Sequence, residues 1–373
     1  MRVGRFHHVA AVGGALLVLG CASSLSPLDE ADLARDLRSR GVDPASIVIP
    51  WEITEEMRVW AHAQVPDNLP EGERLDALLA ALVDPGRLAL QYESGYSGTA
   101  REAFETRKAN CLAFSSLFVG LAREVGVPAF YLDVDDVETF EKEGDLMVIS
   151  RHTSAGFDVG GQMKILDFII PGRQPRYRRL SRLSDKTALA LYHSNRGAEL
   201  LRAGKRRESL DWLQKAVAID PDLGGAWVNL GVALRRGGDV KGAETVYRKS
   251  LEVDPEEASA YQNLAALLRL QGQEAEAGEL LVLATRVGGK NPFSYLALGD
   301  LSLAHGRLDE ARRFYKRALH LYRDNPEPYA ALGLVALEGG NRNEARKWLR
   351  KAASLDRDNE RVRRLDGRLA GTS

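Results

Sequence analysis

The sequence predicts two domains, an α+β domain followed by an all-α solenoid. Two observations support this fold class. Between residues 99 and 169, two helical segments are followed by short segments that have the composition and turn signals of β-strands. A helix block that feeds a small antiparallel sheet is an α+β arrangement. From Ala190 onward, small residues return every 34 residues, which is typical of units that stack into a solenoid.

The N-terminal segment, residues 1–20, is interpreted as a cleaved signal peptide for export. Arg2 and Arg5 precede an apolar stretch over 9–19 that is too short to span a bilayer. Small Gly20 ends this segment, so residues 1–20 are not expected to belong to either folded domain. An ordinary N-terminal helix or a short membrane anchor is the alternative interpretation.

Val18-Leu19-Gly20-Cys21 resembles a bacterial lipoprotein processing site. The resemblance implies a lipid on Cys21 and a tether over residues 21–28. Because Ala22 rather than an acidic residue follows the cysteine, the resemblance also implies the periplasmic face of the outer membrane. The lipid is then the expected membrane attachment, since no later stretch of 18 or more apolar residues suggests a span.

The charge balance disfavours nucleic acid as a partner. The chain has 51 Lys and Arg against 52 Asp and Glu, and removing residues 1–20 gives 49 − 52 = −3. No basic run or patch stands out in the mature chain. The expected partner is instead a protein or peptide.

The first domain is predicted over 29–185 and begins with helices. Their signals lie near 32–40, 52–64 and 71–82, with prolines between them. Thr99 and Glu102 have the spacing of a capping box, and a second, buried helix begins at Cys111.

Extended segments follow these helices. They are predicted at 129–134, 146–150, 153–159 and 162–169, with Gly160-Gly161 as a two-residue hairpin turn. A basic, proline-bearing linker over 171–184 ends the domain.

Three series of small residues with a 34-residue period define the second domain over 190–357. They are Gly197, Gly231, Ala265, Gly299 and Gly333; Ser209, Ala243, Ala277, Ala311 and Ala345; and Ala216, Ser250, Ala284, Ala318 and Ala352. An aromatic residue lies four positions before four members of the first series: Trp227, Tyr261, Tyr295 and Tyr329. This pattern resembles five tetratricopeptide repeats. Residues 358–373 are predicted to form a capping helix and tail.

Cys111 is the candidate nucleophile of the first domain. It is the only free thiol expected in the mature chain, although exported proteins usually pair their cysteines. A thiol in the first turn of a helix faces unpaired backbone N–H groups and the positive end of the helix dipole, which favour the thiolate. A thiolate nucleophile needs an imidazole to move protons, and His152 is the one histidine between Cys111 and the repeats.

Counting residues outward from the Gly160-Gly161 turn predicts that Asp167 lies close to His152. If Val159 faces Gln162, then Asp167 lies opposite Ser154. His152 shares a face with Ser154 because side chains alternate along a strand. His152 and Asp167 are then diagonal neighbours within hydrogen-bonding reach.

Residues 90–170, including Asn110-Cys111-Leu112 and Asp167-Phe168, are similar to bacterial transglutaminase-like domains. The resemblance implies a papain-type fold with Cys111 as nucleophile, His152 as base and Asp167 as the residue that orients it. Thr153 departs from the aromatic or small apolar residue that often follows the histidine, which puts substrate positioning in question.

Other roles for these residues stay open. Cys111 as a small core residue, His152 as a hydrogen-bonded strand residue and Asp167 as a turn carboxylate are the alternatives. The Cys111 backbone N–H is one oxyanion donor, and a second is sought among Gln91, Tyr92 and Tyr96. No His, Cys or carboxylate pair has the spacing of metal ligands, so neither metal nor cofactor is predicted.

Within the repeats, Asn195, Asn229 and Asn263 recur with the repeat period, at a phase that lines the concave groove of tetratricopeptide arrays. This ladder suits the backbone of an extended peptide, and drift from a repeat consensus is the alternative. Ser194 and Ala198 replace the Lys and Asn of the carboxylate clamp in chaperone-binding relatives, so recognition of a free C-terminus is not expected.

Two classes of function fit this sequence. One is an envelope-anchored enzyme in which Cys111 forms a thioester from an amide or peptide bond and the repeats dock a substrate or partner. The other is an assembly lipoprotein whose repeats scaffold a complex without catalysis. A peptidase for one dedicated substrate is a third reading.

Overall fold

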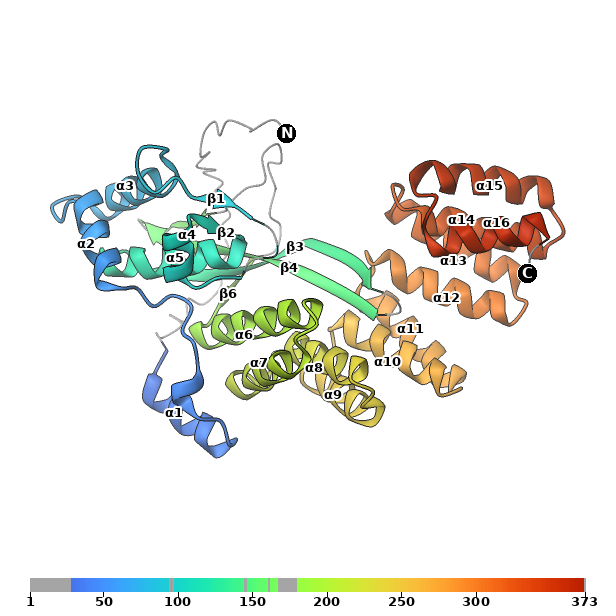
Figure 1. Cartoon of the computed structure of the whole chain (residues 1–373), viewed down its shortest axis with the longest axis horizontal. Helices are drawn as coiled ribbons and strands as arrows, with labels where there is room; N and C mark the ends of the chain where they lie inside the picture. Colours follow the sequence, from blue (N-terminus) through green and yellow to red (C-terminus); the bar gives the residue numbers. More distant parts are fainter. Residues whose placement is uncertain are drawn as a thin grey trace. The chain divides into compact units, whose positions relative to one another are not determined.

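The computed structural model describes residues 28–93, 95, 97–143, 146–159, 162–166 and 180–371 (Figure 1). Contacts divide the chain into two compact units. The first consists of residues 1–139 and 150–233, and the second of 140–149 and 234–373. The predicted signal peptide, Cys21 and Asp167 lie outside the described residues.

Three helices begin the described chain, close to their predicted positions. They are α1 (Glu30–Ser39), α2 (Glu55–Gln64) and α3 (Glu71–Val83), with a 3-10 turn at Pro44–Ser46. Asp29 caps α1 and Thr54 caps α2, since each side chain accepts a first-turn backbone N–H. The sequence therefore specifies the starts of α1 and α2 locally.

Two consecutive helices form the centre of the first unit. α4 spans Ala100–Thr106, and the capping box of Thr99 and Glu102 is present. α5 spans Cys111–Glu124, and its residues from Leu112 to Ala122 are buried. Gly120 allows this burial, because a Cβ there would collide with the Trp51 carbonyl oxygen and the Ile53 side chain. The predicted buried helix that begins at Cys111 is confirmed.

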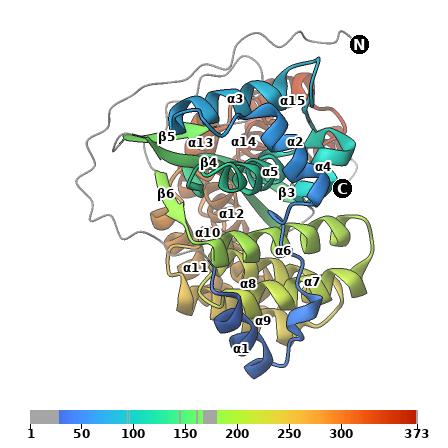
Figure 2. The same cartoon turned by 90° about the vertical axis from the view of Figure 1, so that its left-hand side faces the viewer.

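A four-stranded antiparallel sheet packs against α5 (Figure 2). Its order is β5-β4-β3-β6, with β3 at Ala129–Glu143, β4 at Leu146–Val159, β5 at Gln162–Leu166 and β6 at Leu180–Leu183. Phe118 of α5 contacts Phe157 of β4, with ring centroids 6.4 Å apart. The α+β fold class is confirmed.

Two predictions about the strands were wrong. The segments 146–150 and 153–159 form one strand, because polar Arg151 and His152 do not interrupt backbone pairing along β4. The predicted linker over 171–184 contains β6, whose Leu183 pairs with Tyr131 of β3. Long-range pairing of this kind leaves little local signal in a four-residue strand.

Five helix pairs form the repeats, and a last helix follows them. The pairs are α6 (Asp185–Arg202) with α7 (Arg206–Ile219), α8 (Gly224–Arg236) with α9 (Val240–Val253), α10 (Ala258–Leu270) with α11 (Glu274–Val287), α12 (Pro292–Ala304) with α13 (Leu308–Leu321), and α14 (Pro326–Glu338) with α15 (Arg342–Leu355). α16 spans Glu360–Ala370 and buries Val362, Leu365 and Leu369. The predicted repeats and capping helix are confirmed.

Small residues at fixed phase are buried between the paired helices. At Gly299 of α12 a Cβ would overlap the Tyr315 ring of its partner helix α13, and at Gly333 of α14 it would overlap the Leu365 side chain of the last helix, α16. Ala243, Ala277 and Ala311 have no exposed surface. These positions therefore allow the close helix contacts within and between repeats.

The first repeat shares the hydrophobic core of the α+β domain. Ala188 and Tyr192 of α6 belong to the buried cluster that contains Leu117 and Phe118 of α5. A second cluster joins α1 with α6 and α7, and its members are Leu33, Leu37, Leu189, Ala190, Ala218 and Ile219. The compact units accordingly divide between Ala233 and Leu234, inside the second repeat.

Candidate active site

Cys111 is the first residue of α5, as the sequence predicts. Its side chain is free of disulfide bonding and half-buried. Asn110 caps the helix, because its Oδ1 accepts the Ala113 backbone N–H at 2.9 Å. The helix dipole and the first-turn N–H groups therefore act on the thiol from a defined position.

The segment that leads into Cys111 is held by a short parallel pair of strands. β1 (Gln91–Tyr92) lies beside β2 (Lys108–Ala109), with Gln91 opposite Lys108 and Tyr92 opposite Ala109. Before β2, Arg107 adopts a left-handed conformation with φ of 58°, which a non-glycine residue rarely does. This turn ends α4 and directs the chain along β1.

Two of the suggested oxyanion donors lie on β1, next to the start of the nucleophile helix. Gln91 is exposed, whereas Tyr92 is half-buried and packs against the core. Tyr96 lies outside the described residues. Of the two, Gln91 therefore has the more exposed side chain.

The hairpin register predicted for the base and the acid is confirmed over five residue pairs. Val159 lies opposite Gln162, and the pairing runs to Ala155 opposite Leu166. The Ser154 hydroxyl donates to the Leu166 carbonyl oxygen at 2.8 Å. Asp167, predicted to lie opposite Ser154, is outside the described residues.

His152 is half-buried on β4, three residues before the last described pair of the hairpin. The strand that carries it packs on α5 through Phe157, and the Tyr131 hydroxyl of neighbouring β3 donates to Ser116 Oγ of α5 at 3.1 Å. The sheet with His152 and the helix with Cys111 thus belong to one core. The pairing of Cys111 with His152 stays a prediction.

Sequence reasoning missed Ser97 and Glu199, which are linked by hydrogen bonds to Asn110 at the start of α5. Asn110 Nδ2 donates to Ser97 Oγ at 3.0 Å, and the Ser97 backbone N–H donates to Glu199 Oε1 at 2.9 Å. Ser97 is buried, and Glu199 comes from α6 of the first repeat. The available signal was the charge on Glu199, at a repeat position that is otherwise apolar.

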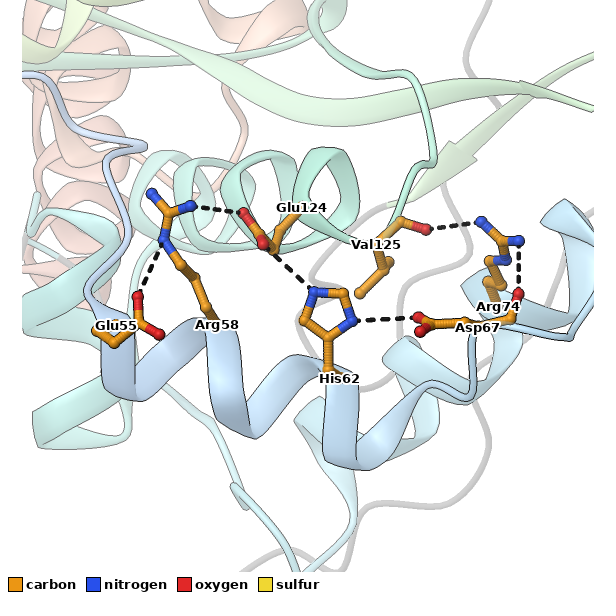
Figure 3. A network of polar contacts seen from close by, with 7 residues as sticks. All are labelled: Glu55, Arg58, His62, Asp67, Arg74, Glu124 and Val125. Carbon is orange, nitrogen blue, oxygen red and sulfur yellow. Dashed lines mark hydrogen bonds and ion pairs between the residues drawn. The ribbon is translucent and has the colours of Figure 1, made fainter.

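A polar network at the far end of α5 fixes that helix to α2 (Figure 3). His62 lies between two carboxylates, with Nε2 3.3 Å from Glu124 Oε1 and Nδ1 3.2 Å from Asp67 Oδ1. Hydrogen bonds to Glu124 and then to Asp67 raise the pKa of His62. Arg58 contacts Glu124 Oε2 at 3.3 Å. The network is at the opposite end of α5 from Cys111, so it serves structure.

The asparagine ladder of the repeats is not uniformly open. Asn229 Nδ2 donates to Ser194 Oγ at 2.9 Å, and both Asn195 and Asn229 are half-buried. Asn263 is fully buried and so does not offer its amide to a peptide. Asn195 and Asn229 are the members that retain exposed surface.

Neither a metal cluster nor a membrane-spanning helix is found in the described part of the chain. No three His, Cys, Asp or Glu side chains gather there in a way that would hold a metal ion. Of the helices in the same residues, none combines the length and apolar character needed to cross a bilayer.

Comparison with protein families supports both halves of the architecture. Residues 59–134 match the transglutaminase-like superfamily, and residues 200–268 and 302–369 match the tetratricopeptide repeat family. The chain thus carries a transglutaminase-like domain followed by tetratricopeptide repeats. The first match contains Cys111 and ends before His152.

Several solved structures resemble about half of this chain. PilF of Pseudomonas aeruginosa is 24% identical, with a TM-score of 0.45, and the match covers 49% of this chain and 83% of PilF. A thermophilic tetratricopeptide protein of Thermus thermophilus is 23% identical, with a TM-score of 0.40 and coverage of 49% and 98%. YrrB, described as having an unusual peptide-binding site, is 19% identical, with a TM-score of 0.38 and coverage of 48% and 91%. No curated protein matches the chain significantly.

Proposed function

We propose that this protein is an envelope-anchored cysteine enzyme of transglutaminase-like type that acts on amide or peptide bonds. The observation that carries the proposal is the placement of Cys111 at the start of a capped and buried helix within the matched domain. A structural cysteine has no need of that position. A nucleophilic cysteine gains from it, because the first turn stabilises negative charge on sulfur.

The proposed reaction proceeds through a thioester. His152 takes the thiol proton as Cys111 Sγ attacks the carbonyl carbon of the amide, and the tetrahedral oxyanion is held by the Cys111 backbone N–H and Gln91. His152 then gives that proton to the leaving amine as the C–N bond breaks. Water or a second amine attacks the thioester, which releases an acid or a new amide and restores the thiol. Asp167 orients His152 in this scheme.

The repeats are proposed to dock a protein partner or the substrate itself. Tetratricopeptide repeats support a protein-interaction role, and this chain carries five helix pairs. Exposed parts of Asn195 and Asn229 are the proposed contacts to a peptide backbone. Because Asn263 is buried, the proposed ladder is shorter than the sequence predicted.

The anchor is proposed to be a lipid on Cys21 at the periplasmic face of the outer membrane. The basic and apolar residues before Cys21 support this proposal. Replacing Cys21 by serine is expected to abolish labelling by a radiolabelled fatty acid and to leave an unprocessed precursor. Unchanged processing would exclude lipoprotein maturation.

A non-catalytic scaffold is the second candidate function, and the five repeats favour it. An amide-directed thiol probe distinguishes the two in full-length protein with the Cys21→Ser change. The enzyme predicts labelling that Cys111→Ala abolishes and His152→Ala strongly reduces. Labelling that does not depend on His152 would indicate an accessible thiol without a catalytic partner and would favour the scaffold.

A further inference from the structure

A chain of hydrogen bonds runs from the first repeat to the start of the nucleophile helix. The Glu199 carboxylate of α6 accepts the Ser97 backbone N–H at 2.9 Å, and Ser97 Oγ accepts from Asn110 Nδ2 at 3.0 Å. Asn110 in turn accepts the Ala113 backbone N–H at 2.9 Å and so caps α5. Cys111 directly follows Asn110. We call Glu199, Ser97 and Asn110 the capping relay.

Glu199, in the first repeat, breaks the apolar pattern that the other repeats show at its position. At the same phase, the other four repeats carry apolar residues: Ala233, Leu267, Leu301 and Val335. The Glu199 side chain is only 17% exposed, and its second carboxylate oxygen accepts from Arg196 at 2.9 Å. Placing a carboxylate at such a position is unfavourable unless it is hydrogen-bonded, and one of its two bonds leads to the relay.

The first repeat is bonded to the nucleophile helix at both ends. Arg123, near the end of α5, forms two hydrogen bonds of 2.9 and 2.8 Å with Asp185, the first residue of α6. At about 1.5 Å per residue, Asp185 and Glu199 are about 21 Å apart along α6, and Asn110 and Arg123 about 20 Å apart along α5. The two spans between the bonded residues are therefore similar in length and opposite in direction, with a polar connection at each end.

We propose that Glu199 is a positioning residue for Cys111, acting through Ser97 and Asn110. The inference rests on the proposed function, because it gives the first repeat a role in the reactivity of the nucleophile. The relay fixes the Asn110 side chain and with it the first turn of α5. The N–H groups of that turn then meet the Cys111 sulfur in one arrangement, which favours the thiolate.

Alkylation of Cys111 by iodoacetamide tests this proposal in the full chain with Cys21→Ser. The rate is measured against pH, well below the unfolding temperature of each variant. Glu199→Ala is expected to lower the rate at pH 7 roughly threefold or more, because the thiolate loses its ordered first turn. Glu199→Gln is expected to stay within about twofold of the parent, since its amide oxygen still accepts the Ser97 N–H. Glu208→Ala, an exposed acid of the same repeat, is the matched control.

Several outcomes would overturn the proposal. A parental rate in folded Glu199→Ala protein would limit Glu199 to a structural role. Alkylation rates that are lowered equally in the Glu199→Ala and Glu199→Gln variants would show an effect of the carboxylate charge rather than of the hydrogen bond to Ser97. If Glu199→Ala does not fold, Ser97→Ala decides: it removes the Oγ acceptor of Asn110, so slower alkylation supports the relay and an unchanged rate contradicts it.

A His152→Ala arm separates this proposal from the proposed function. If His152→Ala leaves the profile unchanged while Glu199→Ala slows alkylation, the Cys–His pair fails and the relay stands. If His152→Ala alters the profile and Glu199→Ala does not, the pair stands and the relay fails.

Discussion

The first repeat and the later repeats share one sequence pattern but pack against different partners. The first repeat supplies Tyr192 to the core of the α+β domain and Asp185 to an ion pair with Arg123. In the fourth and fifth repeats, the two described buried clusters consist of residues of those repeats and of α16. A repeat can thus keep its stacking positions while other positions are recruited to complete a neighbouring domain.

His193 shows the same difference at one position. It lies at the phase where the later repeats have Trp227, Tyr261, Tyr295 and Tyr329. Trp227, Tyr261 and Tyr329 are partly exposed, and each donates to a carbonyl oxygen six residues earlier. His193 is instead fully buried, contacts the Trp212 ring with centroids 4.9 Å apart, and bonds through Nδ1 to the Leu189 carbonyl oxygen. The aromatic position has become a core position in the first repeat.

Truncation should give the largest effect. A chain ending at Ser184 lacks α6 and α7 and therefore exposes the core around Phe118 and Leu37. We expect it to show no cooperative thermal unfolding by circular dichroism, whereas a chain ending at Gly238 keeps α6 to α8 and unfolds cooperatively. A cooperative transition in the shorter chain would show that the α+β domain is complete without the first repeat.

The ion pair that joins the domain to the first repeat should give the next largest effect. Asp185→Asn removes the charge opposite Arg123, and we expect it to lower the free energy of unfolding by about 2 to 3 kcal/mol. The value lies below the range for a fully buried pair because the Arg123 side chain is 31% exposed.

Urea unfolding of Asp185→Asn beside Glu276→Gln provides the comparison. Glu276 pairs with Arg248 in the later repeats, where both side chains are more than 40% exposed, so its loss should cost less than about 1 kcal/mol. Equal costs would mean that the first repeat is no more firmly joined than its successors.

Acid should weaken the first repeat through His193. Its pKa is lowered to about 4, mainly by burial and also by nearby Lys215, while the hydrogen bond to the Leu189 carbonyl oxygen and the charge of Asp211 act in the opposite direction. A depressed histidine pKa leaves stability intact above about pH 6.5 and removes it as the pH falls toward 4. The expected loss of unfolding free energy between pH 7 and pH 5 is about 2 kcal/mol. His193→Asn, which keeps an N–H donor but does not titrate, should lack this loss.

His62 should give the smallest effect, with the opposite sign. Its pKa is raised by Glu124 and Asp67, so the stability it contributes is present below about pH 6.5 and is lost as the pH rises through its folded pKa. The side chain is 44% exposed, so solvent screening keeps the contribution small. The free energy of unfolding of wild type and of His62→Gln should be compared at pH 5.5 and at pH 8. We expect the variant to be less stable than wild type mainly at pH 5.5, and a larger difference at pH 8 would contradict this sign.

Much of the site was predictable because its signals are local. A capping residue specifies a helix start from three or four neighbouring residues, so Asn110 and Cys111 could be placed without tertiary information. The two-residue turn sets a hairpin register by counting, so Val159 opposite Gln162 followed from sequence. The 34-residue series likewise located small residues that the structure buries.

Sequence patterns alone specified the two fold types, the five repeats and the position of Cys111, because each depends on periodicity or on contacts within a few residues. Long-range packing established that β6 pairs with β3, that Asn263 is buried, and that the first repeat completes the core of the α+β domain. These features join residues that are far apart in the chain. Glu199 and Ser97, for example, are separated by 102 positions, and no local pattern specifies a hydrogen bond over that separation.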